Sequence, residues 1–353
     1  MPLTVRPEFP SLARRLLRLI AVTIAMLCAV AAIHADAENT TNIAAKDSLN
    51  AEQDPLPDAQ ACIDRLTWQS QEFSVQVTPA VDQEYDGLVS FPSPEDSGDA
   101  VNDRVTMEWY RPRPKEGETL GLRPAMVVVH ESGSQMEAGR VFARSFRGRG
   151  LQAFLIHLPY YGERRKGGGR PENADFTVLV RQGIADVRRA RDAVAVLPGV
   201  DPARVGLQGT SLGGFVTTLV GSLDHGYQEV FIMLAGADFY DILQTGQKDT
   251  AKLRDKFTQA GYEGERLREL LSPVESLRIA HRLDPAHTWM YSAQDDEVVP
   301  IRNARLLATI AKLEKSHQME FPGGHYSVAL YFPFIVDHVV QQMLPPPADS
   351  GQQ

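Results

Sequence analysis

A serine among small residues is the strongest chemical signal in this sequence. The segment 209–214 reads GTSLGG, with Ser211 third, and lies between a predicted strand at 204–209 and a predicted helix at 212–223. A serine on so sharp a turn adopts a strained backbone, and its close neighbours must be small. Its hydroxyl then projects beside the helix N-terminus, where developing negative charge is favoured. This context predicts a nucleophile, although short runs of small residues also occur by chance.

A serine hydroxyl is a weak nucleophile and needs an oriented base. Asp295 and Asp296 directly follow a predicted strand at 287–293. His325 lies in the glycine-rich run PGGH, just after the last predicted strand at 317–321. The residue types and their order along the chain are typical of a serine that is activated by a histidine, which is itself oriented by a carboxylate. These three groups must therefore converge at one rim of the fold.

Buried strands and amphipathic helices alternate along the second part of the chain, which predicts an α/β fold. Its sheet is expected to be doubly wound and mainly parallel, with helices on both faces. Two earlier runs of alternating polarity, 72–78 and 105–110, predict an antiparallel N-terminal edge. The other predicted strands are 125–130, 152–158, 204–209, 229–236, 287–293 and 317–321, and the predicted helices are 137–149, 176–197, 212–223, 301–315 and 327–343.

On these residues the chain resembles the α/β-hydrolase superfamily, over about residues 105 to 343. In that family the aspartate of the acid loop typically lies four residues before a proline. Pro300 therefore selects Asp296 and leaves Asp295 as a solvated loop carboxylate. His325 matches the family's histidine position. The resemblance implies a serine hydrolase with Ser211 as nucleophile, which requires no cofactor.

The segment 127–134, VVVHESGS, follows the strand that precedes the oxyanion loop in this family. The resemblance implies that the Leu212 N–H and the N–H of Ser132 or Glu131 hold the oxyanion, each worth on the order of 3 kcal/mol of barrier. Ser132 is slightly favoured over Glu131. The His-Glu pair is similar to the dienelactone-hydrolase branch, which uses cysteine in place of Ser211. The Glu131 carboxylate is expected either to tune the nucleophile and repel anionic substrates, or to pair with a nearby arginine.

The segment 158–170, LPYYGERRKGGGR, follows another predicted strand and so lies at the sheet edge where ligands bind. Tyr160 and Tyr161 are candidates to line an acyl or sugar pocket. Arg164 and Arg165 are candidates to hold a substrate carboxylate or phosphate. The alternative is a surface loop with packed tyrosines and solvated arginines.

Composition excludes several other functions. No His or Cys set has the short spacings of a metal site, so we expect no metal. The chain has 36 Lys and Arg against 45 Asp and Glu, a net charge of −9, without a dense basic stripe. This balance argues against nucleic-acid binding. The expected partner is a small-molecule ester.

The N-terminus has the pattern of an export signal. Three arginines within 14–18 precede an uncharged apolar run at 19–33, which is followed by the small-x-small sequence ADA at 35–37. The run is short for a bilayer span, which needs about 20 residues. We therefore expect a cleaved signal peptide at 1–37 and a periplasmic or secreted protein. An uncleaved signal would be its only contact with a membrane.

The rest of the chain is expected to form one catalytic domain at 61–345. The polar segment 38–60 is predicted to be a flexible leader, and 346–353 a disordered tail. Residues 238–286 are mostly helical and form either a lid over the site or an ordinary pair of surface helices. Signal cleavage would leave Cys62 as a lone thiol, so the fold must be held by its core.

Carboxylic ester hydrolysis through an acyl-enzyme is the favoured function. Peptide or amide cleavage on the same fold is the nearest alternative, although related peptidases commonly carry a large extra domain. A binding protein without catalysis is the alternative from another class, but it would not need all of Ser211, Asp296 and His325. The sequence does not indicate the acyl or alcohol group of the substrate, or the oligomeric state.

Overall fold

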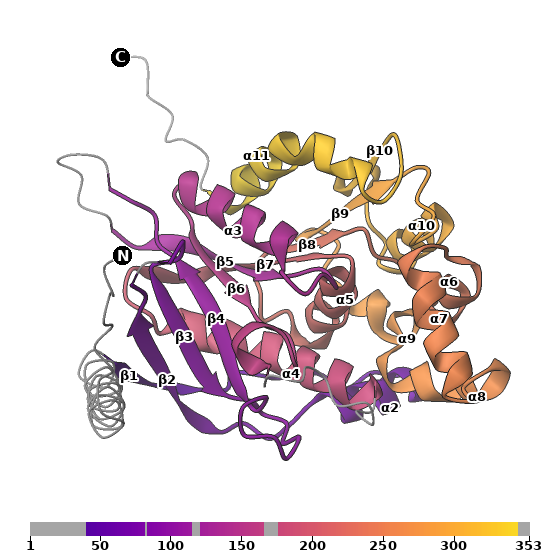
Figure 1. Cartoon of the computed structure of the whole chain (residues 1–353), viewed down its shortest axis with the longest axis horizontal. Coiled ribbons are helices and arrows are strands. Elements are labelled where there is room, and N and C mark those ends of the chain that lie inside the picture. Colours follow the sequence, from indigo (N-terminus) through magenta and orange to yellow (C-terminus); the bar gives the residue numbers. More distant parts are fainter. Residues whose placement is uncertain (1–39, 82, 115–120, 166–175, 345–353) are drawn as a thin grey trace, which may run out of the picture.

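A ten-stranded sheet forms the centre of the computed structural model, which describes residues 40–81, 83–114, 121–165 and 176–344 (Figure 1). Its order is β1-β2-β3-β4-β6-β5-β7-β8-β9-β10. The strands are β1 Thr41–Lys46, β2 Glu72–Pro79, β3 Gly87–Pro92, β4 Arg104–Tyr110, β5 Arg123–Val129, β6 Gln152–Ile156, β7 Val200–Thr210, β8 Val230–Met233, β9 Thr288–Ala293 and β10 Gln318–Phe321. The helices are α2 Pro57–Leu66, α3 Glu137–Gly148, α4 Phe176–Ala195, α5 Leu212–Asp224, α6 Phe239–Thr245, α7 Asp249–Gln259, α8 Gly264–Leu271, α9 Ser276–Ile279, α10 Ile301–Ile310 and α11 Phe332–Met343.

The direction of the strands divides the sheet into two parts. Strands β6, β5, β7, β8, β9 and β10 run parallel to their neighbours within this set. Strands β1 to β4 pair antiparallel with one another, and β4 pairs antiparallel with β6. The predicted mainly parallel sheet with an antiparallel edge is confirmed. That edge is wider than predicted, because β1 and β3 join the two strands expected there.

The predicted flexible leader at 38–60 is wrong for its described residues. Strand β1 pairs with β2 over its whole length, and α2 begins at Pro57. The segment is polar because its polar groups are used inside the fold. The Asp47 carboxylate forms a buried bidentate ion pair with Arg189 of α4, at 2.8 and 2.6 Å, and the Ser48 hydroxyl donates to Asp192 at 2.6 Å.

The parallel strands are apolar on both faces because helices cover both sides of the sheet. Along β5, Val127 and Val129 belong to one hydrophobic cluster, whereas Met126 and Val128 belong to another. The first cluster includes residues of α4, α5 and α10, and the second those of α3 and α11. This alternation of side chains across the pleat explains the continuous apolar run at 125–130.

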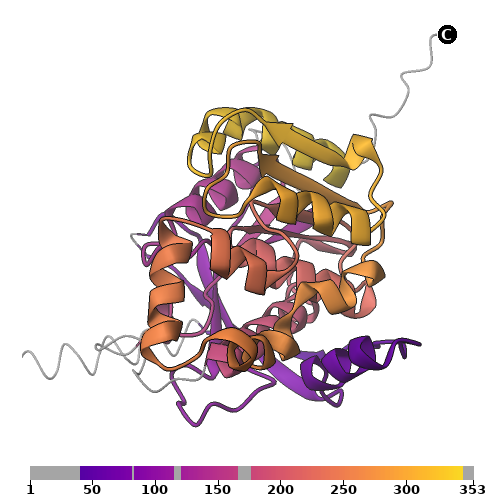
Figure 2. The same cartoon turned by 90° about the vertical axis from the view of Figure 1, so that its right-hand side faces the viewer.

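The segment 238–286 forms helices α6 to α9 and packs beside helices α4, α5 and α10 (Figures 1 and 2). It has a small core of its own, in which Leu243, Phe257 and Leu267 pack with Phe176 of α4. No helix of the described ranges is both long enough and apolar enough to span a membrane. The predicted signal peptide and the predicted C-terminal tail lie outside the described residues.

Candidate active site

Ser211 lies on a tight turn between β7 and α5. Its backbone has φ 54° and ψ −114°, a strained conformation for a residue with a side chain. A Cβ at Gly209 would lie 2.2 Å from the carbonyl oxygen of Gly213, and a Cβ at Gly213 would lie 2.1 Å from that of Val129. The two glycines are therefore required because β5, β7 and α5 approach one another closely beneath the serine.

His325 contacts the Ser211 hydroxyl from the loop after β10. Its Nε2 lies 3.1 Å from Ser211 Oγ, and its Nδ1 lies 2.7 Å from Asp296 Oδ2. An ionised carboxylate only accepts hydrogen bonds, so the ring hydrogen belongs on Nδ1. Nε2 is then free to accept the serine proton. The arrangement can therefore activate the Ser211 hydroxyl as a nucleophile.

Asp296, rather than Asp295, is the carboxylate that faces His325. It is buried after β9, and its Oδ1 accepts the backbone N–H groups of Val298 at 2.8 Å and Val299 at 2.9 Å. Asp295 is exposed. The turn at the end of β9 thus fixes the Asp296 side chain with both oxygens occupied.

His130 fixes the orientation of the loop after β5. Its Nδ1–H donates to the carbonyl oxygen of Glu131 at 2.6 Å, and its Nε2 accepts the Leu158 N–H at 3.2 Å. Burial lowers the pKa of His130 to about 3, so the ring stays neutral, as accepting at Nε2 requires. In a trans peptide the C=O and the N–H point in opposite directions. The Glu131 carbonyl oxygen points at the His130 ring, so the Ser132 N–H of the same peptide points away from that ring.

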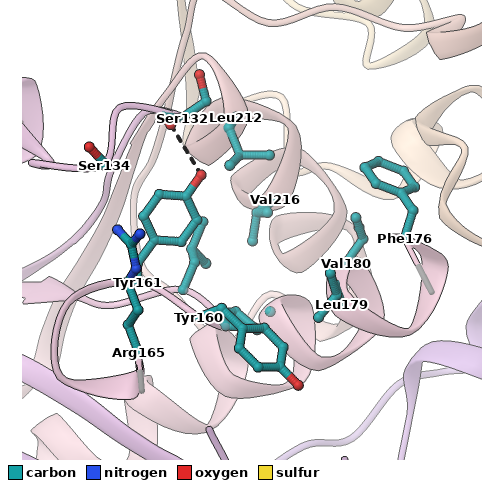
Figure 3. Close-up of a pocket in the computed structure, with 13 residues that line it drawn as sticks. Ser132, Ser134, Tyr160, Tyr161, Arg165, Phe176, Leu179, Val180, Leu212 and Val216 are labelled. Carbon is teal, nitrogen blue, oxygen red and sulfur yellow. Dashed lines mark hydrogen bonds between the residues drawn. The ribbon is translucent and has the colours of Figure 1, made fainter. Parts of the chain in front are cut away.

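These orientations favour Ser132 over Glu131 as the second oxyanion donor. The carbonyl oxygen of His130 faces the start of α5, because it lies 2.7 Å from where a Cβ of Gly213 would be. The Glu131 N–H, on the opposite side of that peptide, points away from α5. Leu212 is the first residue of α5, where the N–H has no partner within the helix. Ser132 and Leu212 border the same pocket (Figure 3).

The Glu131 carboxylate caps helix α3, and in the described part of the chain no hydrogen bond or ion pair joins it to Ser211 or to an arginine. Its oxygens accept the N–H groups of Ala138 and Gly139, each at 3.2 Å, in the first turn of α3. A carboxylate is stabilised at a helix N-terminus by the free N–H groups and the helix dipole. Glu131 therefore anchors the oxyanion loop to α3 rather than touching Ser211 or an arginine.

A pocket of about 300 Å³ opens beside Leu212 (Figure 3). Tyr160 and Tyr161 line it, at the place predicted for them, although contact with a substrate stays a prediction. The Tyr161 hydroxyl donates to the carbonyl oxygen of Ser132 at 3.1 Å, which ties the pocket wall to the oxyanion loop. The lining residues are Ser132, Ser134, Leu158, Pro159, Tyr160, Tyr161, Arg165, Phe176, Leu179, Val180, Gly183, Leu212 and Val216.

The prediction that Arg164 holds a substrate anion is wrong. Its side chain is buried, forms an ion pair with Asp186 at 2.8 Å and donates to the carbonyl oxygens of Asn102 and His157. Its neighbour Arg165 is exposed and borders the pocket. The short helical turn at Gly162–Arg164 points one arginine inward and the next outward, which the sequence alone does not reveal.

A buried hydrogen-bond network around Glu108 was not predicted from the sequence. Glu108 of β4 accepts hydrogen bonds from Arg140 of α3 at 2.6 Å and from the Tyr110 hydroxyl at 2.6 Å, and lies 3.3 Å from His157 Nε2. Burial acts to raise the pKa of Glu108, but the bonds with His157, Arg140 and Tyr110 outweigh it and hold that pKa at about 2. No local pattern marks a glutamate within an apolar strand as part of such a network.

This lowered pKa predicts how Glu108 contributes to stability as pH changes. The unfolded carboxyl has a pKa of about 4.3, so ionised Glu108 stabilises the fold by roughly 3 kcal/mol, fully above that pH and progressively less as pH falls toward 2. We expect Glu108→Gln to lower the free energy of unfolding in urea at pH 7. Its difference from the wild type should shrink between pH 5 and pH 2. Glu84→Gln, at an exposed ion pair, is the control with little effect at any pH, and a pH-independent loss for Glu108→Gln would contradict the prediction.

Comparison with known proteins adds the fold family. No protein-family model and no curated protein sequence matches the chain. Acetyl xylan esterase from Paenibacillus sp. R4 matches in structure with a TM-score of 0.61 and 16% identity, over 84% of this chain and 96% of that one. Acetyl Xylan Esterase 1 from Thermoanaerobacterium sp. JW/SL YS485 matches with a TM-score of 0.50 and 15% identity, over 82% and 96%. A puromycin-hydrolyzing peptidase of Mycobacterium tuberculosis matches with a TM-score of 0.51 and 14% identity, over 78% of this chain and 47% of that one.

The likenesses to the two acetyl xylan esterases each cover more than four fifths of both chains. At such identities they establish the architecture of the chain and leave its reaction to the geometry of its own side chains. The protein has the α/β-hydrolase fold.

Proposed function

We propose that this protein is a serine hydrolase that cleaves carboxylic esters through an acyl-enzyme. The observation that carries the proposal is the continuous chain from Asp296 through His325 to Ser211, at 2.7 and 3.1 Å. The strained turn at Ser211 supports it, since such strain is retained where it serves function. The esterases among the structural neighbours support ester rather than amide substrates.

The first half-reaction forms the acyl-enzyme. Ser211 Oγ attacks the carbonyl carbon of the ester while His325 Nε2 takes the hydroxyl proton. Asp296 stabilises the imidazolium that results. The former carbonyl oxygen becomes an oxyanion, held by the N–H groups of Leu212 and Ser132. When the tetrahedral intermediate collapses, the C–O bond breaks and His325 gives its proton to the leaving alcohol.

The second half-reaction releases the acid. His325 Nε2 takes a proton from water, whose oxygen attacks the acyl carbon of the ester on Ser211. The same two N–H groups hold the second oxyanion. As this intermediate collapses, the bond between the acyl carbon and Ser211 Oγ breaks, and His325 returns its proton to Ser211 Oγ. The pocket of about 300 Å³ beside Leu212 gives space for a compact, mainly apolar substituent of the substrate.

The proposal includes export, which rests on the sequence pattern at 1–37 alone. Export predicts that the protein recovered from the periplasm or medium begins near residue 38. A full-length protein retained in the cytoplasm would contradict this part of the proposal without affecting the chemistry.

A fluorophosphonate probe tests the proposed function, with the signal-trimmed protein as the sample. We expect the wild type to be labelled and Ser211→Ala to remain unlabelled. Ser134→Ala, which removes an exposed serine that lines the pocket beside Leu212, is the matched control and should be labelled normally. An unlabelled wild type would contradict the proposal and favour a binding protein.

A comparison of substrates distinguishes ester hydrolysis from peptide or amide cleavage. We expect p-nitrophenyl esters of short acids to be cleaved with a higher kcat/KM than aminoacyl anilides, after correction for their uncatalysed rates. A preference for the anilides would favour peptide or amide cleavage, as the neighbouring peptidase performs.

A further inference from the structure

We propose that residues 246–250, which lead into helix α7 and include its first two residues, are a positioning element. They hold the acid loop and the base loop of the site in fixed positions relative to each other. The inference rests on the proposed function. The acid loop is 295–299, which contains Asp296, and the base loop is 323–327, which contains His325. The two loops contact each other through the Asp296–His325 hydrogen bond and through the Asp295 N–H, which donates to the carbonyl oxygen of Gly323 at 3.0 Å. Asp249 and Thr250, which are adjacent, add one further contact to each loop.

Thr250 holds the acid loop. Its hydroxyl donates to the carbonyl oxygen of Val298 at 2.8 Å, and both residues are buried. The N–H of Val298 in turn donates to Asp296 Oδ1 at 2.8 Å. A hydroxyl of the helical segment thus reaches the Asp296 carboxylate through a single intervening residue.

The backbone before α7 reinforces this contact. The Gln247 N–H donates to the carbonyl oxygen of Glu297 at 2.6 Å. A Cβ at Gly246 would lie 2.6 Å from the carbonyl oxygen of Val298, so only glycine permits this approach without a shift. This part of the 238–286 segment is therefore fixed to the acid loop, and it cannot move as a lid without disturbing Asp296.

Asp249 holds the base loop. The hydroxyl of Tyr326, the residue after His325, donates to Asp249 Oδ2 at 2.6 Å. The rings of His325 and Tyr326 lie edge to face, with centroids 5.4 Å apart. Movement of Asp249 would therefore be transmitted directly to the imidazole.

Asp249 also adds negative charge near the imidazole. Hydrogen bonds from Lys252 and Tyr326 lower the pKa of Asp249, so this carboxyl stays ionised at neutral pH. A second anion beside Asp296 favours the imidazolium that forms when Ser211 is deprotonated. Among the described residues, the ionisable groups on the acid loop, the base loop and the start of α7 are Asp249, Asp295, Asp296, Glu297, Lys248, Lys252 and Tyr326.

Thr250→Val tests the hold on the acid loop, because valine keeps the shape and removes the hydroxyl. We expect kcat for a p-nitrophenyl ester to fall roughly 5- to 20-fold with KM changed less than about two-fold, as for loss of one positioning hydrogen bond. Thr250→Ser, which keeps the hydroxyl, should restore kcat. A merely structural threonine would instead give a lower Tm with an unchanged kcat.

Asp249→Asn tests the charge near the imidazole. We expect the acid limb of the kcat/KM profile to move to lower pH by a few tenths of a unit, because the imidazolium loses a favourable neighbour, and the shift to vanish near 1 M salt. Asp255→Asn removes a charge from an exposed position of the same helix and should leave the limb in place. Tyr326→Phe keeps the Asp249 charge, so it should lower kcat without moving the limb.

The positioning role is overturned if Thr250→Val keeps the wild-type kcat and Asp249→Asn keeps the wild-type acid limb of the kcat/KM profile. If Thr250→Val does not fold, the exposed Asp249 and Tyr326 variants decide the outcome. Labelling of the wild type by the fluorophosphonate probe separates the two proposals. A labelled wild type with unaltered variants overturns only the positioning role, whereas an unlabelled wild type overturns both.

Discussion

Replacing Asp296 by asparagine is expected to lower kcat/KM by about 10⁴-fold, the size of effect known when a serine hydrolase loses the carboxylate behind its histidine. Asparagine has nearly the same shape but carries no charge to stabilise the imidazolium. Its amide N–H can also donate to His325 Nδ1. The ring hydrogen would then move to Nε2, which could no longer take the Ser211 proton.

Asp295→Asn provides a matched control for this measurement. It removes the same charge one residue away, from an exposed side chain that does not face His325. We expect kcat/KM to stay within about two-fold of the wild type, since an exposed charge is largely screened. Esterase assays on both variants, with circular dichroism to verify folding, decide the point. Equal losses in the two variants would remove the reason for placing Asp296 in the reaction.

The central sheet and the candidate catalytic residues were predictable because each has a local cause. Apolar runs such as 125–130 must be strands buried on both faces, and the alternation with helices then determines a parallel sheet. Ser211 and His325 were found because glycines mark tight turns at the ends of strands. Asp296 needed the family resemblance to be separated from Asp295.

Residues that act through distant partners were not predictable. Arg164 and Arg165 are adjacent and identical, and the inward one is bound by Asp186 on α4 and by two backbone carbonyl groups from distant parts of the fold. Glu131 caps a helix that begins six residues later, and Thr250 binds a carbonyl group 48 residues away. Such contacts depend on the assembled fold and leave no periodic pattern in the sequence.

The misplaced leader has the same physical origin. Composition assigns a polar segment to solvent, yet Asp47 and Ser48 are polar because α4 presents buried arginine and aspartate side chains to them. The segment therefore gains stability from paired charges as well as from apolar contacts, such as those of Ala45 and Ala59 with the main core. The paired charges give these residues a measurable role in the stability of the fold.

Asp47→Ala is accordingly expected to lower the free energy of unfolding by about 3–5 kcal/mol, because it leaves the buried guanidinium of Arg189 without its anion. It also removes the acceptor of the Trp68 indole N–H at 2.8 Å and of the Gln71 N–H at 3.0 Å. In a domain of this size the loss corresponds to a fall in Tm of roughly 6–10 °C. Urea unfolding and calorimetry measure both quantities.

Asp201→Ala is the matched control, since it breaks a partly exposed aspartate–arginine pair with Arg204 at 2.7 Å. It should cost less than about 1 kcal/mol. The double variant Asp47→Asn with Arg189→Met removes both charges and should recover part of the loss, because no unpaired ion is left in the interior. Equal stability of Asp47→Ala and the wild type would mean that β1 and the residues after it can detach without cost, as expected of a flexible leader and not of a strand held by a buried ion pair.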